Sequence, residues 1–249
     1  VPSTLRVPAK SFADGLLRAI DKNAAAVVAA TPVIASRYKN RRTVVVGNEA
    51  RLDDFLACEP SFSARRVLST GQTSDAHCFR QSVEAVAALD GVSLAVAGPE
   101  PVGGVWNWAQ NVLGDRLIYL GWLDRKGMAE AISSSSVGLV TYQNSPTHDT
   151  NRPNKVFEFA AAGLPVVGTP NKSIRHLAGR GGFASIAKDF SADAFRDAIG
   201  EALSSEVNWI ARSISARSWA QAEGSWTVSE AKLLALYSEL LDELESSVG

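Results

Sequence analysis

Residues 151–167 are NRPNKVFEFAAAGLPVV, a segment that joins a short helix to the strand after it. Pro153 suits the first turn of a helix, where its missing N–H would have no helical partner, and Gly163 suits the left-handed conformation that commonly ends one. The apolar run 165–168 follows at once. The segment therefore predicts a short helix that leads into a buried strand, the repeating unit of an α/β fold.

The two faces of this predicted helix differ in chemistry. Lys155 and Glu158 share one face by their spacing, whereas the other face is apolar and contains Val156, Phe159 and Ala160. A lysine in the first turn opposes the helix dipole by roughly 0.3–1 kcal/mol, so stability alone does not favour Lys155 there. An anionic ligand at the helix start would favour it. The alternative is a surface ion pair between Lys155 and Glu158, worth about 0.2–0.5 kcal/mol.

On both sides of this helix, apolar runs alternate with segments of helical periodicity. Most of the runs are continuously apolar, as strands buried on both faces of a sheet are. They lie at residues 66–69, 92–97, 116–120, 137–142, 165–168 and 183–186. A helical apolar period starts at Phe79, and Asp124 and Ser191 are candidate N-caps of two later helices. This order predicts a Rossmann-like, doubly wound parallel sheet.

The two ends of the chain have a different pattern. Short helical and extended segments precede residue 65, at residues 11–20, 25–30, 33–38 and 43–47. They suggest one strand and helix of another domain followed by a linker. The last segment predicts helices with an apolar stripe that a partner surface must cover, formed by Leu233, Leu234, Tyr237, Leu240, Leu241 and Leu244. We therefore expect three parts, residues 1–48, 49–208 and a C-terminal helical extension at 209–249.

The composition limits the classes of function. With 25 basic and 26 acidic residues among 249, the formal charge of −1 lacks the positive excess that nucleic-acid binding usually needs. Cys58 and Cys78 are too few for a disulfide scaffold, and no cysteine or histidine has metal-ligand spacing. No apolar run reaches the ~18 residues of a membrane span. We expect a soluble cytoplasmic protein without a bound metal.

Two short features favour an alternative location, peripheral contact with the inner face of a membrane. Trp106 and Trp108 in VWNW could form an exposed apolar patch, although residues two apart usually leave one facing the core. The basic cluster Lys39, Arg41 and Arg42 is more typical of a solvated linker, and contact with anionic lipid is the alternative.

The segment PNKVFEFAAAGLPVV, at residues 153–167, resembles the donor-site signature of family 4 glycosyltransferases. In that signature Pro-x-Lys-x-x-Glu is followed by Ala-x-Gly-x-Pro-Val-Val. Four further segments occur in the order of the family: RRVLSTG, LAVAGPE, IYLGWL and SSSSVGLVTY. The resemblance covers most of residues 65–202, and residues 27–48 look like the end of the family's N-terminal domain and the interdomain crossing. It implies a GT-B fold of which this chain holds the C-terminal, donor-binding domain. The start at Val1 rather than Met fits the expectation that most of the acceptor-binding domain is missing.

The resemblance implies roles for residues of the predicted helix. Glu158 matches the glutamate that hydrogen-bonds the ribose hydroxyls of the donor nucleotide. Lys155 matches a residue near the diphosphate, where its charge would stabilise the leaving nucleotide. The helix start would add contacts, chiefly from backbone N–H groups, at Asn151, Arg152 and Asn154.

Residues after two predicted strands complete the implied donor site. Trp122 and Leu123, just beyond the third strand, match the loop that lies against the nucleobase. Gly71, after the first strand, would let the backbone approach the phosphates or the sugar, and Gln72 beside it is a further candidate contact.

Two departures from the family pattern accompany these matches. Many members have a second glutamate eight residues before Glu158, where this sequence has Thr150, with Asp149 adjacent as a substitute. Many also have Gly-Arg followed five residues later by Lys, as phosphate ligands. Here Gln72 and His77 occupy the positions of that arginine and lysine, which weakens the expected phosphate clamp.

The resemblance thus implies retaining transfer of a sugar from a nucleotide-diphosphate donor to a glycan or lipid-linked acceptor, in polysaccharide biosynthesis. Lys155 and Glu158 are the candidate catalytic residues, and we expect no metal or other cofactor. Without the acceptor-binding domain the chain should bind donor but be inactive. Two alternatives remain: a sugar-nucleotide epimerase of the same fold, and a non-catalytic subunit that binds a partner glycosyltransferase. Thr150, Gln72 and His77 favour the latter.

Overall fold

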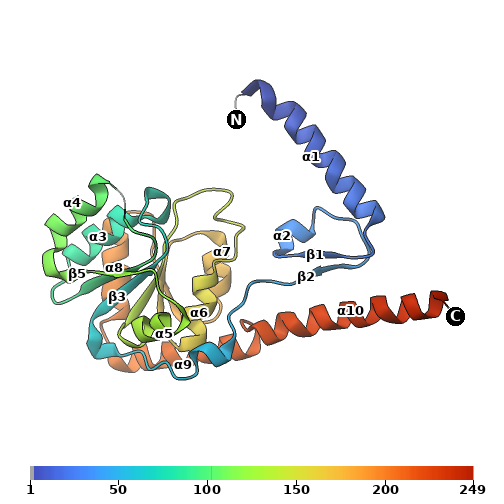
Figure 1. Ribbon diagram of the computed structural model, residues 1–249. Helices are drawn as coiled ribbons and strands as arrows, with labels where there is room; N and C mark the ends of the chain where they lie inside the picture. The colour runs from blue at the N-terminus through green and yellow to red at the C-terminus, as the bar shows by residue number, and fades with distance from the viewer. Residues whose placement is uncertain (1–2, 102, 249) are drawn as a thin grey trace. The chain divides into compact units, whose positions relative to one another are not determined.

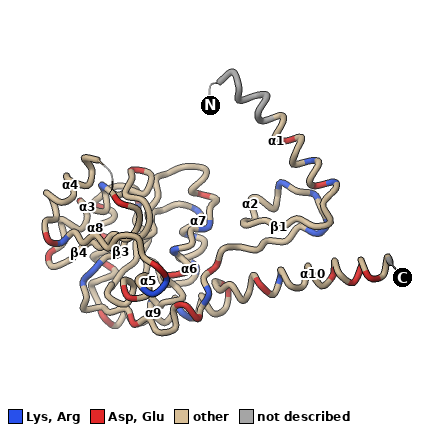
Figure 2. Tube along the Cα trace, in the orientation of Figure 1, with Lys and Arg blue, Asp and Glu red and all other residues tan. Residues whose placement is uncertain are grey.

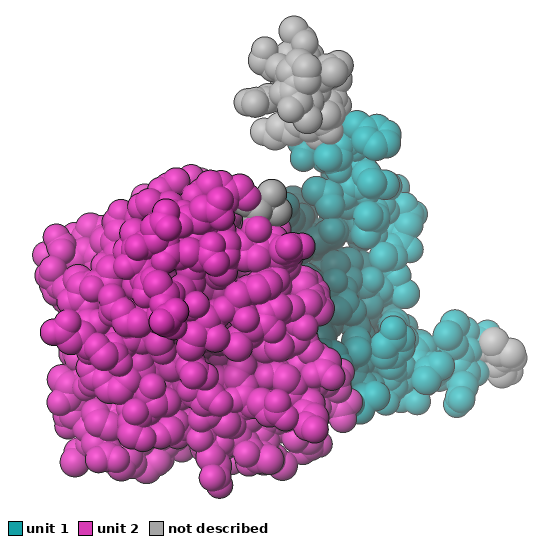
Figure 3. Space-filling view, turned by 60° about the vertical axis from the view of Figure 1, so that its left-hand side comes forward, with its two compact units in different colours: residues 1–48, 226–249 teal, residues 49–225 magenta. Residues whose placement is uncertain are grey.

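The computed structural model describes residues 3–101 and 103–248, and the side chains of residues 11–101 and 103–247 (Figure 1). Lys and Arg are interspersed with Asp and Glu along its trace (Figure 2). The chain divides into two compact units (Figure 3): unit 1 contains residues up to Asn48 and from Trp226 onward, and unit 2 is Glu49–Ser225.

Unit 2 is built on a six-stranded sheet in which every neighbouring pair of strands is parallel. The strands are β3 (Arg66–Thr70), β4 (Ser93–Ala97), β5 (Leu117–Gly121), β6 (Val137–Val140), β7 (Val166–Gly168) and β8 (Ala184–Ile186). Their order in the sheet is β5-β4-β3-β6-β7-β8. The chain therefore builds outward from β3 in one direction and then returns to its other side with β6, which is a doubly wound topology.

Helices cover both faces of this sheet. One face packs against α3 (Phe79–Ala87), α4 (Gly104–Leu113) and α8 (Ala192–Ala202). The other packs against α5 (Arg125–Ser133), α6 (Asn154–Ala162), α7 (Lys172–Ile174) with the π-helical turn η5 (Arg175–Gly179), and α9 (Glu206–Ala222). Successive strand residues point to opposite faces, so Val67 joins the first core and Leu68 the second. Four short 3₁₀ turns complete the unit: η1 (Leu52–Phe55), η2 (Phe62–Ala64), η3 (Asp75–His77) and η4 (Gly114–Arg116).

The six strands predicted from the sequence are confirmed, with ends that shift by one or two residues. Asp124 caps α5 by accepting from the Gly127 N–H at 2.8 Å, and Ser191 caps α8 by accepting from the Ala194 N–H at 3.2 Å. Helix α4 had no prediction because it begins after Gly103 without a side-chain cap. In it Trp106 stacks on Phe79, with ring centroids 6.1 Å apart.

Unit 1 contains a parallel pair of strands, β1 (Val27–Ala29) and β2 (Thr43–Val45), with α1 (Ser3–Asn23), α2 (Pro32–Ala35) and α10 (Trp226–Val248). The expected elements are present, although α1 is longer and α2 shorter than the sequence pattern predicts. Arg42, from the predicted basic cluster, forms ion pairs with Glu239 and Glu243 of α10. Among the helices of the described residues, none combines the length and hydrophobicity that a membrane span requires.

The predicted C-terminal segment 209–249 is shared between the two units. Helix α9 packs against α6 through Ala216 and Ala220, which belong to the core of unit 2. The expected apolar stripe on α10 is only partly covered: Leu233 and Leu240 are half-buried, and Leu236, which is not one of its residues, is buried. Four of the six stripe residues are exposed: Leu234, Tyr237, Leu241 and Leu244.

Candidate functional site

The order of the strands reverses between β3 and β6, and this reversal brings several segments together at the carboxyl ends of the strands. These strands are neighbours although β4 and β5 lie between them in the sequence. Two loops and the start of α6 meet beyond the carboxyl ends of the strands. Ligands of open parallel sheets bind in this position, where helix N-termini present free N–H groups.

Two glycines bring the ends of β3 and β4 together. Gly71 has φ 102° and donates its N–H to the Ala97 carbonyl at 2.8 Å, while Gly98 has φ 153° and donates to the Gly121 carbonyl at 2.9 Å. A Cβ on Gly98 would lie 2.3 Å from the Gly71 carbonyl oxygen. Both the φ angle and this backbone contact therefore require glycine at position 98.

Gly98→Ala should lower the free energy of unfolding by about 1–3 kcal/mol and displace the loop at Gly71, because the added methyl group meets backbone rather than a flexible side chain. Denaturant unfolding followed by circular dichroism measures the loss. The matched control is Gly104→Ala at the start of α4, where no atom lies within 4 Å of the new Cβ. Equal stability of the two variants would contradict this account.

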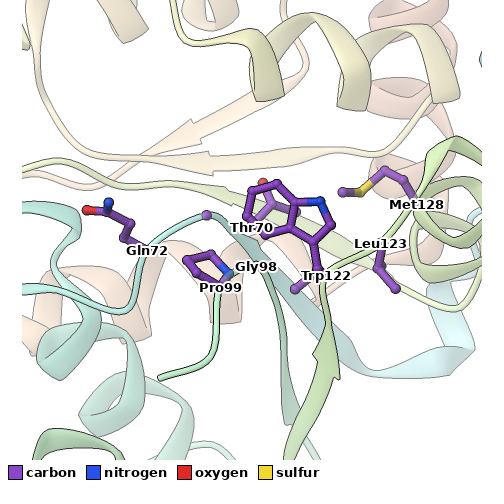
Figure 4. Close-up of a pocket in the computed structure, with 9 residues that line it drawn as sticks. Thr70, Gln72, Gly98, Pro99, Trp122, Leu123 and Met128 are labelled. Carbon is purple, nitrogen blue, oxygen red and sulfur yellow. The ribbon is translucent and has the colours of Figure 1, made fainter. Parts of the chain in front are cut away.

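A pocket of about 310 Å³ opens at this edge of the sheet (Figure 4). Four of the residues predicted from the sequence line it: Gly71, Gln72, Trp122 and Leu123. The other lining residues are Thr70, Ala97, Gly98, Pro99 and Met128. The Trp122 side chain is 79% exposed, so a flat ligand can cover its ring without displacing a core residue. Mostly apolar walls beside the glycine turns suit a ligand with one flat part and one polar part.

Lys155 extends from the first turn of α6 to the end of β3. Its Nζ donates to the Thr70 carbonyl oxygen at 2.6 Å and lies 3.9 Å from where a Cβ on Gly71 would be. It also lies 5.3 Å from the centre of the Tyr142 ring. Burial lowers the pKa of Lys155 to about 8, and the nearby charge of Glu158 opposes this shift. The positive charge is thus held at the edge of the pocket at a cost in solvation, which an anionic ligand would offset.

Glu158 lies one turn further along α6 and is partly buried. Burial raises the pKa of its carboxyl group, while the charge of Lys155 lowers it. Neither side chain is therefore a freely solvated member of a surface pair. The predicted apolar face of α6 is confirmed, since Val156, Phe159 and Ala160 are fully buried.

A group of aromatic and basic side chains lies beside Lys155. The Tyr142 ring is 5.3 Å from the ring of His77 and 4.9 Å from that of His148. His77 ends η3, and its backbone carbonyl accepts from the Thr141 hydroxyl at 2.8 Å. The loops after β3 and β6 are thereby joined at the switch point of the sheet.

The remaining predicted residues lie at the start of α6, with side chains engaged elsewhere or exposed. Arg152 donates to Glu49 at 2.6 Å and stacks over Phe157. Asn151 accepts from the Ser173 hydroxyl at 3.4 Å, and Asn154 is exposed. The first N–H groups of a helix have no partner within the helix, so in this turn the backbone, rather than these side chains, is available to a ligand.

Sequence reasoning missed several residues of this region. Gly98 and Pro99 lie in the segment LAVAGPE and line the pocket. The glycine at the end of the predicted strand could have indicated a turn beside the site. Met128 follows the cap residue Asp124 by four positions, which places it one turn along α5. Tyr142 and His148 had no local signal, because their grouping with His77 depends on the neighbouring positions of β3 and β6.

The chain matches a known protein family over residues 64–205, more than half of its length. That family is described as glycosyl transferases, group 1. A comparison with curated proteins found no match.

Solved structures give a likeness of fold. Sucrose-phosphate synthase from Thermosynechococcus elongatus is similar over 92% of this chain and 62% of its own length, with a TM-score of 0.73 and 20% identity. HepE from Anabaena, in a structure with UDP-glucose, is similar over 92% of this chain and 69% of its own, with a TM-score of 0.70 and 14% identity. WaaG, described as a glycosyltransferase involved in lipopolysaccharide biosynthesis, is similar over 82% of this chain and 60% of its own, with a TM-score of 0.64 and 16% identity. This chain thus spans less than two thirds of the first of these proteins, and the likeness confirms the Rossmann-like, GT-B type of fold.

Proposed function

This chain belongs to the group 1 glycosyl transferases, and from that membership we propose that unit 2 binds a nucleotide-diphosphate sugar for transfer to an acceptor. The observation that carries the proposal is the position of Lys155, a desolvated ammonium group at the end of β3 and the edge of the pocket. A positive charge that is kept there despite the cost of its desolvation would be stabilised by the negative charges of a diphosphate.

In this proposal the pocket and α6 divide the donor between them. The nucleobase covers Trp122 and Leu123, and the diphosphate lies over Gly71 and Gln72. Lys155 and the backbone N–H groups at the start of α6 neutralise the diphosphate, including those of Arg152 and Asn154. The N–H of Asn151, the third residue predicted there, donates instead to the Thr147 carbonyl at 3.0 Å. Glu158 accepts hydrogen bonds from the ribose hydroxyls, for which a partly buried carboxylate is well suited.

The finer features of the proposal follow from the resemblance of residues 153–167 to family 4 glycosyltransferases. We propose a retaining reaction, and an acceptor that is a glycan or a lipid-linked sugar. The acceptor-binding domain would be supplied outside the matched region, so donor binding is the activity expected of the chain alone. The solved structure of HepE with UDP-glucose supports a nucleotide sugar as the donor class.

Isothermal titration of the chain with UDP, GDP and ADP, each to millimolar concentration, tests donor binding directly. We expect one of the three to bind, and EDTA to leave its affinity unchanged, since Lys155 and α6 supply the positive charge. If none of the three binds, the proposal is wrong. Loss of binding with EDTA would overturn only its metal-free part.

Glu158→Ala should weaken binding of that nucleotide by about 1–3 kcal/mol, the usual loss for a hydrogen bond to a charged group. The control is Glu130→Ala, which removes an exposed carboxylate of α5 from a pair with Lys126. The 2′-deoxy nucleotide should bind the unsubstituted chain more weakly and the Glu158 variant with no further loss. Equal losses from the deoxy nucleotide in both proteins would assign the ribose contact elsewhere.

The second candidate is a non-catalytic subunit that uses the fold to bind a partner glycosyltransferase. The replacement of expected ligands by Thr150, Gln72 and His77 favours it. Transfer or hydrolysis of the bound nucleotide sugar by a longer chain with its acceptor-binding domain would support catalysis, and its absence would support the subunit.

A further inference from the structure

His77 occupies a position between the two loops that meet at the switch point of the sheet. Its Nδ1 lies 2.8 Å from the Ser74 hydroxyl, so a bound ligand would be contacted through Nε2. Its ring lies 5.3 Å from the Tyr142 ring, over which the Lys155 ammonium group lies at the same distance. The His148 ring lies 4.9 Å from the Tyr142 ring, and its Nδ1 lies 2.8 Å from the Gln143 carbonyl oxygen. The imidazole of His77 thus belongs to the same cluster as the ammonium group of Lys155.

The charges around His77 disfavour its protonated form in the free protein. Burial lowers the pKa of His77, and the charges of Lys155 and His148 lower it further. Tyr142 and Cys78 contribute no negative charge near neutral pH, because burial raises the pKa of each to about 12. Other charged groups on the elements around His77 are Asp75 of η3, Arg80 of α3 paired with it at 3.7 Å, and Glu158 of α6. Asp149, beside His148 in the loop after β6, accepts from the Lys172 N–H at 3.0 Å, and Glu84 lies further along α3.

A diphosphate would reverse this balance. One negative charge about 6 Å from an imidazole, at an effective dielectric constant of about 20, shifts its protonation equilibrium by about a hundredfold. A sugar-linked diphosphate carries two such charges. His77 would then be neutral in the free protein and positively charged in the complex.

We propose that binding of the donor diphosphate at this site is coupled to the uptake of one proton by His77. The inference rests on the proposed function. It adds a dependence of the affinity on pH in acidic solution, where Lys155 stays charged and produces none. As the pH falls through the range between the free and the bound pKa of His77, affinity should rise. Below that range His77 is charged in both states, and the affinity should become constant.

The test is titration of the chain at pH 6.5, in buffers of different ionisation enthalpy, with whichever of UDP-, GDP- and ADP-glucose binds. A nucleotide sugar is used because the terminal phosphate of UDP itself titrates near pH 6. At pH 6.5 Lys155, with a pKa of about 8, is already charged and takes up almost no proton. We expect uptake of about 0.5–1 proton per nucleotide sugar bound, lost in His77→Gln. The control His176→Gln changes the third histidine, which lies on η5 away from this cluster, and should keep the uptake.

A second measurement protects the test against a variant that does not fold. The three histidine ring signals in a proton NMR titration can be assigned with the His176 and His148 variants, and the signal of His77 should titrate at higher pH with that nucleotide sugar bound. Binding without proton uptake, or uptake that persists in His77→Gln, overturns this inference and leaves the proposed function standing. If UDP-, GDP- and ADP-glucose all fail to bind, both are wrong.

Discussion

Replacing Phe159 with alanine should lower the free energy of unfolding by about 3–5 kcal/mol, the range of the largest losses known from truncating one core side chain. Phe159 is fully buried on α6 and lies directly over Gly138 of β6, where an added Cβ would come within 2.4 Å of its ring. Its removal leaves a cavity between the helix and the sheet that neither element can close. Guanidinium unfolding followed by circular dichroism measures the loss.

A control and a double mutant make this expectation specific. Leu56→Ala removes a side chain that is 67% exposed and should change stability by less than about 1 kcal/mol. Gly138→Ala is destabilising alone because its methyl group meets the Phe159 ring, but in the Phe159→Ala background that methyl group enters the cavity. The double mutant should therefore lose less than the sum of the two single losses. Additive losses would contradict the packing of Phe159 on Gly138.

Much of the fold of unit 2 follows from local patterns in the sequence. Apolar runs of the length of strands, with capped amphipathic segments between them, are sufficient to predict β3 to β8. The burial of Phe157 is not, because it depends on Trp219 of α9, whose ring stacks on it at 5.7 Å from 62 positions away. Helix α6 is consequently buried on two faces, whereas the spacing of its apolar residues predicts burial of only one face.

The candidate site is likewise predictable from local sequence only in part. The resemblance of residues 153–167 to a known signature is enough to select Lys155 and Glu158 as candidates. The side-chain direction of Arg152 was not predictable, because its partner Glu49 is 103 positions away. The grouping of His77 with Tyr142 was also hidden, since it needs β3 and β6 to be neighbours. Local sequence thus identifies individual residues, and the order of the strands determines which of them meet.

Lys155→Met should abolish or severely weaken nucleotide binding, by about 2–5 kcal/mol, which is roughly 30-fold or more in Kd. Methionine keeps the length of the side chain and removes the charge beside Thr70 and Gly71. Isothermal titration with the nucleotide that binds the unsubstituted chain measures the loss. Lys126→Met, which removes an 86% exposed ammonium group of α5, is the control and should keep full affinity.

The same variant should not lose stability, and this separates a binding role from a structural one. Burial lowers the pKa of Lys155 from its usual 10.5 to about 8, so between these values the unfolded chain holds a proton that the folded chain lacks. The free energy of unfolding therefore rises with pH across this range, by roughly 1–3 kcal/mol, and the cost of burying the charge is fully present below pH 8. Lys155→Met should remove that rise and be at least as stable as the unsubstituted chain at pH 7, as urea unfolding at pH 7, 8.5 and 10 can measure. A variant that kept its affinity but lost stability would show that Lys155 serves the fold through its bond to Thr70, and the diphosphate role would be wrong.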